Sequence, residues 1–175
     1  MASDPRYPIG PWSWPDTVPA AARPGLVQEI ADTPSLLRAA VEGLDDAQLD
    51  TPYRDGGWTL RQVVHHLPDS HVNSYTRFRL ALTEEQPTIR AYREERWAEL
   101  PDARTLPPGV SLALLDALHA RWVVLLRSMT DADFARKLVH PEHGVIPLDK
   151  MLAMYAWHGK HHVAHVTTLR IQRGW

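Results

Sequence analysis

Histidines are concentrated near the C-terminus, where residues 157–166 (WHGKHHVAHV) contain four of the ten histidines of the chain. On a helix, side chains four residues apart lie on the same face, so His158 and His162 could direct two ring nitrogens at one ion. His161 and His165 have the same spacing. A histidine-rich surface turn is the alternative that needs no metal. The cluster therefore predicts metal binding. The position of each histidine around the helix must decide which of the two pairs binds the metal.

The face that carries His158 and His162 is the one that a helix in this region would bury. At about 100° per residue, both histidines share an arc with the apolar residues of the segment. This arc consists of Met151, Tyr155, His158, His162, His165 and Leu169. Buried neutral imidazoles need a partner for each ring nitrogen, and one cation can meet that need for several of them. We therefore expect His158 and His162 to be the ligand pair.

The absence of cysteine limits the chemistry further. Without thiolates, a metal must be held by histidine, aspartate or glutamate, and the protein has no thiol nucleophile and no disulfide. Any thiol chemistry needs a small-molecule thiol.

Composition predicts one soluble domain spanning residues 1–175. A chain of this length with 44% hydrophobic residues can bury one substantial core. A formal net charge of −2, with scattered basic residues, argues against nucleic acid as a partner. The polar N-terminus does not resemble a signal peptide, and no continuous apolar run approaches 18 residues. We expect no membrane partner and a cytoplasmic location.

The elements that must position the histidines are helices. Prolines predict an extended arm over residues 1–24, and apolar periodicity predicts helices at about 26–44, 59–82, 111–129 and 148–172. Pro34 fits either a kink or a second helix start capped by Thr33. Residues 84–110 form a long connection, a candidate lid or crossover, and 137–146 an irregular or hairpin element. The fold class is an all-α four-helix bundle, in which facing helices supply metal ligands.

A third ligand should come from a facing helix, and adjacent histidines at 65 and 66 are the source. On the helical wheel His65 lies about 140° from the centre of the apolar arc, whereas His66 lies at its inner flank. We choose His66. Pro68 removes a backbone hydrogen bond nearby, so we expect a kink or break there, and His71 remains an alternative ligand or a buried neighbour.

Other polar residues could orient a ligand or bind substrate. His119 lies on an apolar stripe, where a core histidine is the simpler interpretation and a ligand or acid–base group the other. A polar strip near His66 could equally be a solvated helix face. It consists of Gln62, Ser70, Asn73 and Arg77.

Separate motifs follow one another along nearly the whole chain. They are Tyr7-Pro-Ile-Gly10, Asp50-Thr-Pro-Tyr53, Gly56-Gly-Trp-Thr59, Gln62-Val-Val-His-His-Leu67, Asp69-Ser-His71, Asn73-Ser-Tyr75, Ala81-Leu-Thr-Glu84, His119-Ala-Arg-Trp122, Trp157-His158 and His161-His162. In this order the motifs resemble those of the DinB-like metal-dependent superfamily, and within it the YfiT group of metal-dependent hydrolases, also described as bacillithiol transferases.

This resemblance implies an up-down-down-up bundle with one divalent transition metal per chain, held by His66, His158 and His162. Three imidazoles and water suit zinc, nickel, copper or iron, and we expect zinc or nickel. The resemblance also suggests bacillithiol as thiol donor and a homodimer, for which the N-terminal arm could cross to a neighbour. Pro68 departs from the alanine that the family pattern has there.

Three neutral imidazoles leave the double positive charge of the ion uncompensated and one or more of its coordination positions open. Such a site is typical of catalysis, because the ion lowers the pKa of a bound water or thiol. Gly159 follows His158, so the zinc-protease pattern H-E-x-x-H is absent and peptidase activity is disfavoured. We expect a thiol S-transferase that modifies an electrophilic substrate. The alternatives are a hydrolase that uses metal-bound hydroxide and a non-catalytic metal-binding stress-response module, which chelation would unfold.

Candidate residues for these reactions fall into two sets. Proton transfer could use His119, His161 or Asp69. Carboxylates of the thiol could be received by arginine, for which the candidates are Arg77, Arg79 and Arg121, although a surface charge is the simpler interpretation of each. Asn73 belongs with them as a candidate substrate-binding residue.

Overall fold

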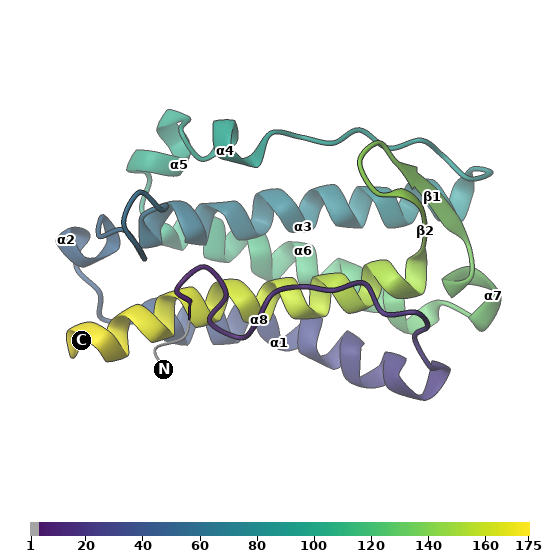
Figure 1. The fold of residues 1–175 in the computed structure, drawn as a ribbon, viewed down its shortest axis with the longest axis horizontal. Helices are drawn as coiled ribbons and strands as arrows, with labels where there is room; N and C mark the ends of the chain where they lie inside the picture. Colours follow the sequence, from purple (N-terminus) through teal and green to yellow (C-terminus); the bar gives the residue numbers. More distant parts are fainter. Residues whose placement is uncertain (1–3) are drawn as a thin grey trace.

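Four long helices pack side by side in the computed structural model, which describes residues 4–175 (Figure 1). The first three residues of the expected arm lie outside the described part of the chain. The long helices are α1 (Arg23–Val41), α3 (Leu60–Thr83), α6 (Pro108–Ser128) and α8 (Leu148–Arg173). The expected four-helix bundle is therefore confirmed, with boundaries within a few residues of those expected from apolar periodicity.

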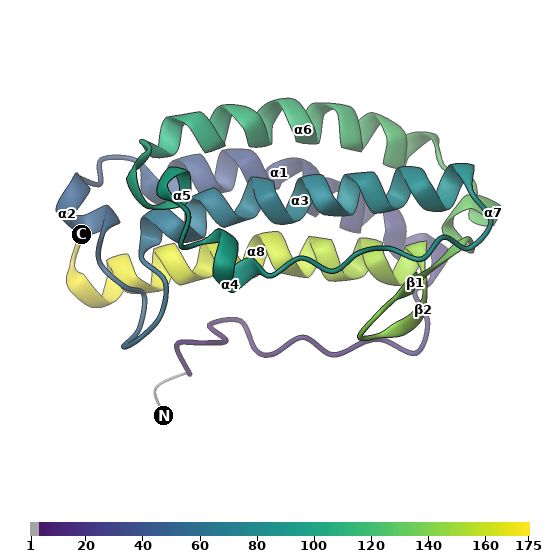
Figure 2. The ribbon, with the colours of Figure 1, turned by 90° about the horizontal axis from the view of Figure 1, so that it is seen from above.

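The helices have the up-down-down-up order. Figures 1 and 2 show α1 and α8 running in one direction and α3 and α6 running in the other. Helix α1 packs against α8 and α6, and α3 packs against α6 and α8. Because α3 and α6 are parallel, the chain must return along the whole bundle between them. This requirement explains the long connection that follows α3.

Local sequence fixes the ends of the two helices that carry the histidine cluster. Thr59 precedes α3 and accepts the Gln62 amide N–H, while the Gln62 side chain accepts the Thr59 amide N–H, which is a complete capping box. Helix α8 is terminated by Gly174, the residue after Arg173, whose φ of 69° is the left-handed conformation that glycine adopts most readily. Each of these helices thus has a boundary that its own sequence defines.

Prolines inside two of the helices do not interrupt them. Helix α1 is continuous through Pro34, and Thr33 donates its hydroxyl to the Glu29 carbonyl rather than capping a second helix. Helix α3 is likewise continuous through Pro68, so the expected break near His66 is wrong. Packing on neighbouring helices holds each helix together across the hydrogen bond that its proline cannot make.

The connection between α3 and α6 contains two short helices, α4 (Glu94–Trp97) and α5 (Pro101–Thr105). Its far end is fixed by Arg61 of α3, which is 4% exposed and donates to the Leu106 carbonyl. The same guanidinium pairs with Asp46 and Asp50, in and beside the short helix α2 (Asp46–Leu49). A buried arginine with three oxygen partners holds this connection against the start of α3.

A β-hairpin lies between α6 and α8, after the short helix α7 (Asp131–Phe134). Strand β1 (Lys137–His140) pairs antiparallel with β2 (Gly144–Pro147), so that His140 faces Gly144. The hairpin alternative expected for residues 137–146 is confirmed. Its strands lie beside the first turns of α8 (Figure 2). Residues of its turn line the cavity described below.

The N-terminal arm runs along α8 as far as residue 19 and enters α1 through a short 3-10 helix, Ala20–Ala22 (Figure 1). Arg23 and Pro24 already belong to α1, because proline is well accommodated in a first helical turn, and the expected arm was therefore too long. The Arg6 carbonyl accepts a hydrogen bond from His165 of the same chain, so the arm packs against the bundle of its own chain. A homodimer and a cytoplasmic location stay predictions.

Two apolar clusters form the core, one toward each end of the bundle. Trp122, Phe78 and Leu148 belong to one, and Leu60, Leu67 and Leu115 to the other, and all six are fully buried. In the described part of the chain, α6 alone is long and apolar enough to span a membrane by length and composition. It packs against α1 and α3 here, and core helices of bundles meet the same criteria.

Candidate metal centre

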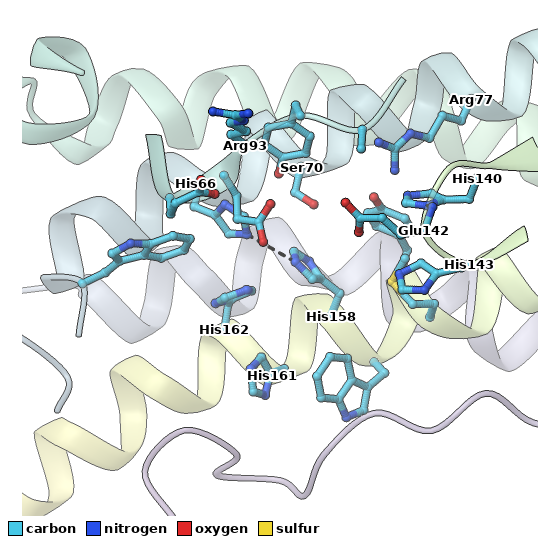
Figure 3. A pocket seen from close by; sticks show the side chains of 18 residues that line it. His66, Ser70, Arg77, Arg93, His140, Glu142, His143, His158, His161 and His162 are labelled. Atoms are coloured by element: carbon cyan, nitrogen blue, oxygen red, sulfur yellow. Dashed lines mark hydrogen bonds between the residues drawn. The ribbon is translucent and has the colours of Figure 1, made fainter. Parts of the chain in front are cut away.

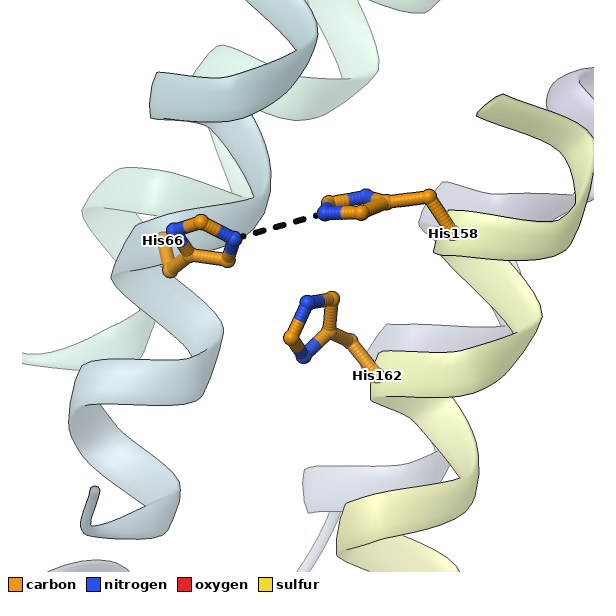
Figure 4. Close-up of side chains that lie close together, drawn as sticks. All are labelled: His66, His158 and His162. Carbon is orange, nitrogen blue, oxygen red and sulfur yellow. Dashed lines mark hydrogen bonds between the residues drawn. The ribbon is translucent and has the colours of Figure 1, made fainter. Parts of the chain in front are cut away.

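Three histidines from two facing helices meet between the ends of the bundle. His66 comes from α3, and His158 and His162 come from successive turns of α8. Each offers one ring nitrogen, and these nitrogens all lie within 4.8 Å of one another. Figure 4 shows the three rings close together, between the two helices that carry them. The structure thus brings together the three residues that were expected to be the ligands.

The separation of two of these nitrogens fits a metal ion. Nε2 of His66 lies 3.4 Å from Nε2 of His158. Two nitrogens that bind the same tetrahedral zinc, each at about 2.0–2.1 Å, are about 3.4 Å apart. The donor set, three imidazoles without a thiolate or carboxylate, also suits nickel, copper or iron. The residues present therefore fit a divalent transition metal.

Burial keeps these imidazoles neutral, which is the form that binds metal. Burial, with the nearby charge of His161, lowers the pKa of His66 to about 3. Burial also lowers the pKa values of His158 and His162 well below their ordinary range, and each is lowered further by the neighbouring histidines. At neutral pH each of the three rings is therefore uncharged and offers a lone pair.

A cavity of about 610 Å³ opens beside the three histidines (Figure 3). Helices α3 and α8 form one side of it, and the connection after α3 contributes residues 91–95. The hairpin supplies His140, Glu142 and His143. The candidate metal centre is therefore reached from a space large enough for a small organic substrate.

The two adjacent histidines of α3 lie in different surroundings, as their helical phases indicate. His65 lies outside the cavity lining, with Nδ1 2.6 Å from the Ser111 hydroxyl and Nε2 3.0 Å from the Leu106 carbonyl. Both of its nitrogens have partners at the junction of α5 and α6. His65 is thus a structural histidine, and His66 alone of this pair faces the cavity.

His71 and His119 lie behind the site in the core. Nε2 of His71 is 3.1 Å from Nδ1 of His158, and Nδ1 of His71 is 2.7 Å from Nε2 of His119. The expectation that His71 is a buried neighbour fits this position better than its alternative as a ligand. His119 does not line this cavity, and its role as an acid–base group stays a prediction.

His161 lines the cavity and stacks on Trp157, with ring centroids 4.3 Å apart. Its Nδ1 is buried and has no hydrogen-bond partner among the described residues. Burial, with the charge of His165, lowers its pKa to about 4, so the ring is neutral at physiological pH. His161 is placed where it could accept a proton from a ligand, and its role as proton carrier stays a prediction.

Three other candidates lie outside the cavity lining. Asn73 donates its side-chain amide to the Asp69 carbonyl, one turn earlier in α3. Arg121 is exposed and lies over the Tyr75 ring. Burial, with the charge of Asp102, raises the pKa of Asp69 to about 6. The structure therefore does not support Asn73 or Arg121 as substrate-binding residues or Asp69 as a proton carrier at this cavity.

Arg77 does line the cavity, as expected of an arginine that receives a carboxylate there. Its side chain is 7% exposed and donates to the Arg90 carbonyl. Among the described residues, Arg77 forms no ion pair with a carboxylate. A buried cation without a counter-ion, at the wall of a cavity, is suited to an anionic ligand.

The residues that the connection and the hairpin bring to the cavity were not predicted. They come from segments without helical periodicity, so no phase argument could place them. The closeness of His140, Glu142 and His143 in the sequence was the one signal available. The unpredicted residues of the cavity lining include Tyr92, Arg93, Glu94, Glu95, His140, Glu142 and His143.

Two further groups of potential ligands occur in the described part of the chain. One combines His161 and His165 with His162, a ligand that the first group already uses. The other, at the hairpin turn, is largely exposed. The group from α3 and α8 is distinguished by its two facing helices and by its position at the cavity.

Comparison with known proteins gives the same site a family context. The model of the DinB superfamily matches residues 29–166, a span that reaches from α1 to α8. The chain belongs to the DinB superfamily. The matched region contains His66, His158 and His162 and the connection that borders the cavity.

Relatives that match this chain over almost the whole length of both proteins are named as enzymes. A protein of Bacillus mycoides (strain KBAB4) is 54% identical over 172 residues, covering 98% of this chain and 99% of its own length. One of Bacillus cereus (strain B4264) is 53% identical over 173 residues, covering 99% of each chain. Both are named "Putative metal-dependent hydrolase". These similarities support a metal-dependent enzyme.

Solved structures extend the comparison. YfiT from Bacillus subtilis, described as a probable metal-dependent hydrolase with an unusual four-helix bundle topology, matches with a TM-score of 0.95 and 50% identity over 98% of each chain. A mycothiol-dependent maleylpyruvate isomerase matches with a TM-score of 0.67 and 17% identity, covering 85% of this chain and 61% of that one. The second likeness concerns the fold alone.

Proposed function

We propose that this protein is a metal-dependent S-transferase that joins a low-molecular-weight thiol, bacillithiol or a similar one, to an electrophilic substrate. The observation that carries the proposal is the combination of three neutral imidazoles with an open cavity in a protein that has no cysteine. The nucleophile must then arrive with a small molecule. One distant structural neighbour is described as mycothiol-dependent, which is consistent with a small-molecule thiol.

In this proposal His66, His158 and His162 hold one divalent ion, zinc or nickel. Such an ion lowers the pKa of a thiol bound to it, so that the sulfur is a thiolate at neutral pH. Arg77 binds a carboxylate of the thiol, and His161 accepts the thiol proton. The sulfur then forms a bond to the electrophilic carbon, whose leaving group departs with its electron pair.

The walls of the cavity determine which substrates enter. Trp58 and Trp157 provide aromatic surface, while Arg77 and Arg93 are cationic. Glutamates from the connection and the hairpin also line the cavity, so its charge is mixed and an amino group can be accommodated as well as a carboxylate. A thiol that carries both charges fits this lining better than a wholly apolar molecule does.

Hydrolysis is the second candidate, and the names of the relatives favour it. In this case water takes the place of the thiol, and His161 is the candidate general base at the cavity. Gly159 follows His158, so α8 supplies no glutamate at the position that the zinc-protease pattern uses. The two functions share the site and differ in the nucleophile.

The test uses zinc-loaded protein, bacillithiol and monochlorobimane, whose chloride is displaced when the sulfur attacks. We expect fluorescent conjugate to form rapidly only when both metal and thiol are present. Arg77→Gln should raise the KM for the thiol by about 10- to 150-fold, since a charge-assisted hydrogen bond is worth about 1.5–3 kcal/mol. Arg121→Gln, on the exposed face of α6, is the matched control and should behave as wild type.

Two outcomes would contradict the transferase. The first is a conjugation rate that does not depend on the enzyme, or that His66→Ala leaves unchanged. The second is rapid hydrolysis of an activated ester by the metal-loaded protein without thiol, together with no acceleration of conjugation, which would favour the hydrolase.

A further inference from the structure

A proline in the middle of α1 leaves one carbonyl without its usual helical donor. Pro34 has no N–H, so the carbonyl of Ile30, four residues earlier, lacks the hydrogen bond that continues an α-helix. Ile30 is fully buried, and buried carbonyls in proteins are almost always paired. Its partner comes from another helix: Nδ1 of His119 in α6 lies 2.7 Å from the Ile30 oxygen.

That carbonyl determines where the proton of His119 lies. A carbonyl can only accept, so Nδ1 of His119 must be the donor. Burial lowers the pKa of His119 to about 4, so the ring is neutral and carries one proton. Its Nε2 is therefore a bare acceptor, and it lies 2.7 Å from Nδ1 of His71.

The same argument continues to the candidate metal centre. Because Nε2 of His119 can only accept, Nδ1 of His71 carries the proton and donates it, which leaves Nε2 of His71 bare. That nitrogen lies 3.1 Å from Nδ1 of His158. Nδ1 of His158 must then donate, and Nε2 of His158 is left with its lone pair on the side of His66, whose Nε2 is 3.4 Å away.

We infer that the Ile30 carbonyl, acting through His119 and His71, fixes His158 in the tautomer whose Nε2 is free to bind metal. His71 and His119 are thus positioning residues that act through His158, and Pro34 makes the carbonyl available. Hydrogen bonds of this kind to metal-binding imidazoles orient the ring and increase its basicity. The inference rests on the proposed metal centre but not on the thiol reaction.

His162, the other α8 histidine at the site, is linked to a backbone carbonyl through a single histidine. Nε2 of His165 lies 3.2 Å from the Arg6 carbonyl in the N-terminal arm, so that nitrogen donates. Nδ1 of His165 then accepts from Nδ1 of His162, which is 3.3 Å away. The remaining nitrogen of His162, Nε2, is left bare. Both α8 ligands are thus connected to a backbone carbonyl that sets their tautomer.

Nitrogen-15 NMR of the zinc-loaded protein tests the inference directly, because long-range ¹H–¹⁵N correlations distinguish protonated from bare ring nitrogens. We expect His71, His119 and His158 all to carry the proton on Nδ1. A proton on Nε2 of His71 or His119 would overturn the inference. Neither result bears on thiol transfer, so the inference and the proposed function fail separately.

Variants of His119 supply an independent measurement. His119→Leu removes both hydrogen bonds and should weaken zinc binding by about 10- to 100-fold, as loss of such partners does elsewhere. His119→Gln can still donate to the Ile30 carbonyl and accept from His71, and should recover most of the affinity. Competition with a zinc-binding dye gives the Kd of each variant.

A structural control separates positioning from general stability. Leu115→Ala, at a fully buried position of the same helix, should lower the Tm while leaving the zinc Kd within about threefold of wild type. If Leu115→Ala and His119→Leu weaken zinc binding equally, or if His119→Leu leaves it unchanged, the positioning role is wrong. If His119→Leu does not fold, the zinc Kd of His119→Gln and the tautomers of His71 and His158 in that variant decide.

Discussion

At the scale of single residues, environment separates side chains of the same type. His65 and His66 are adjacent, yet one is held by Ser111 and a backbone carbonyl and the other faces the cavity. Asp69 is three residues further along α3 and is partly buried without an ion pair among the described residues. We therefore expect Asp69 to affect stability rather than proton transfer at the cavity.

Asp69→Asn tests this interpretation. Burial, with the charge of Asp102, raises the pKa of Asp69 to about 6, so the folded chain binds this proton more tightly than the unfolded chain. The contribution of Asp69 to stability consequently decreases as pH rises from about 4 to 6. At neutral pH we expect Asp69→Asn to raise the free energy of unfolding by about 1 kcal/mol, allowing for solvent screening. Urea denaturation measures the change.

The catalytic activity of Asp69→Asn tests the same interpretation. Because Asp69 lies outside the cavity lining, the rate of bimane conjugation should remain close to wild type. A decrease of about tenfold or more in kcat, with unchanged KM, would restore Asp69 as a proton carrier. Asp102→Asn, which removes only the neighbouring charge, should give a smaller gain in stability.

At the scale of elements, the site depends on a close approach of α1 and α8. Gly159 lies between His158 and Lys160 and faces Thr33 of α1. A Cβ atom at position 159 would lie 2.9 Å from Cγ2 of Thr33 and closer still to its hydroxyl. Glycine is therefore needed here for helix packing, and it lets α8 lie at the depth at which its histidines meet His66.

We expect Gly159→Ala to destabilise the protein by about 1–3 kcal/mol through overpacking, although alanine is the better helix former. The same displacement of α8 should weaken zinc binding. Gly25→Ala, in α1 with open space around its Cβ, is the control and should not lower the Tm. Adding Thr33→Ala to Gly159→Ala should restore stability, and a double variant no more stable than Gly159→Ala would show that the contact is not the cause.

At the scale of the whole molecule, the buried histidines couple folding to pH. His119 is hydrogen-bonded to α1 and α3, and burial lowers its pKa to about 4, against smaller opposing effects of the Ile30 carbonyl and Asp116. In the unfolded chain its pKa is about 6.5. The unfolded chain therefore binds more protons below that value, and stability is lost as pH falls from about 6.5 toward 4.

The metal-free protein should accordingly lose about 2 kcal/mol of unfolding free energy through His119 alone between pH 7 and about pH 5. His119→Gln cannot titrate at this position and should show a shallower dependence. Urea denaturation in the presence of a chelator, at a series of pH values, gives both slopes. Equal slopes in the two proteins would contradict the assignment of His119 as a buried neutral ring.

Much of this architecture follows from patterns that are local in sequence. Apolar periodicity locates the four long helices, and the phase of α3 selects His66 over His65 without any tertiary contact. The two errors about proline have different causes. Pro68 does not break α3, because packing against neighbouring helices overrides the local preference of proline. Pro24 lies inside α1 for a local reason that the predicted arm overlooked, since a first helical turn has no hydrogen bond for proline to remove.

Residue types and helical spacing, which act over a few residues, were enough to establish the helices, the lack of a protein thiol and the three histidines that share one site. Tertiary packing was needed to place Asn73, Arg121 and Asp69 outside the cavity lining. It also brings the hairpin to the cavity and joins His119 to a carbonyl freed by Pro34. Such contacts join residues far apart in the chain, and no local pattern encodes which of them will meet.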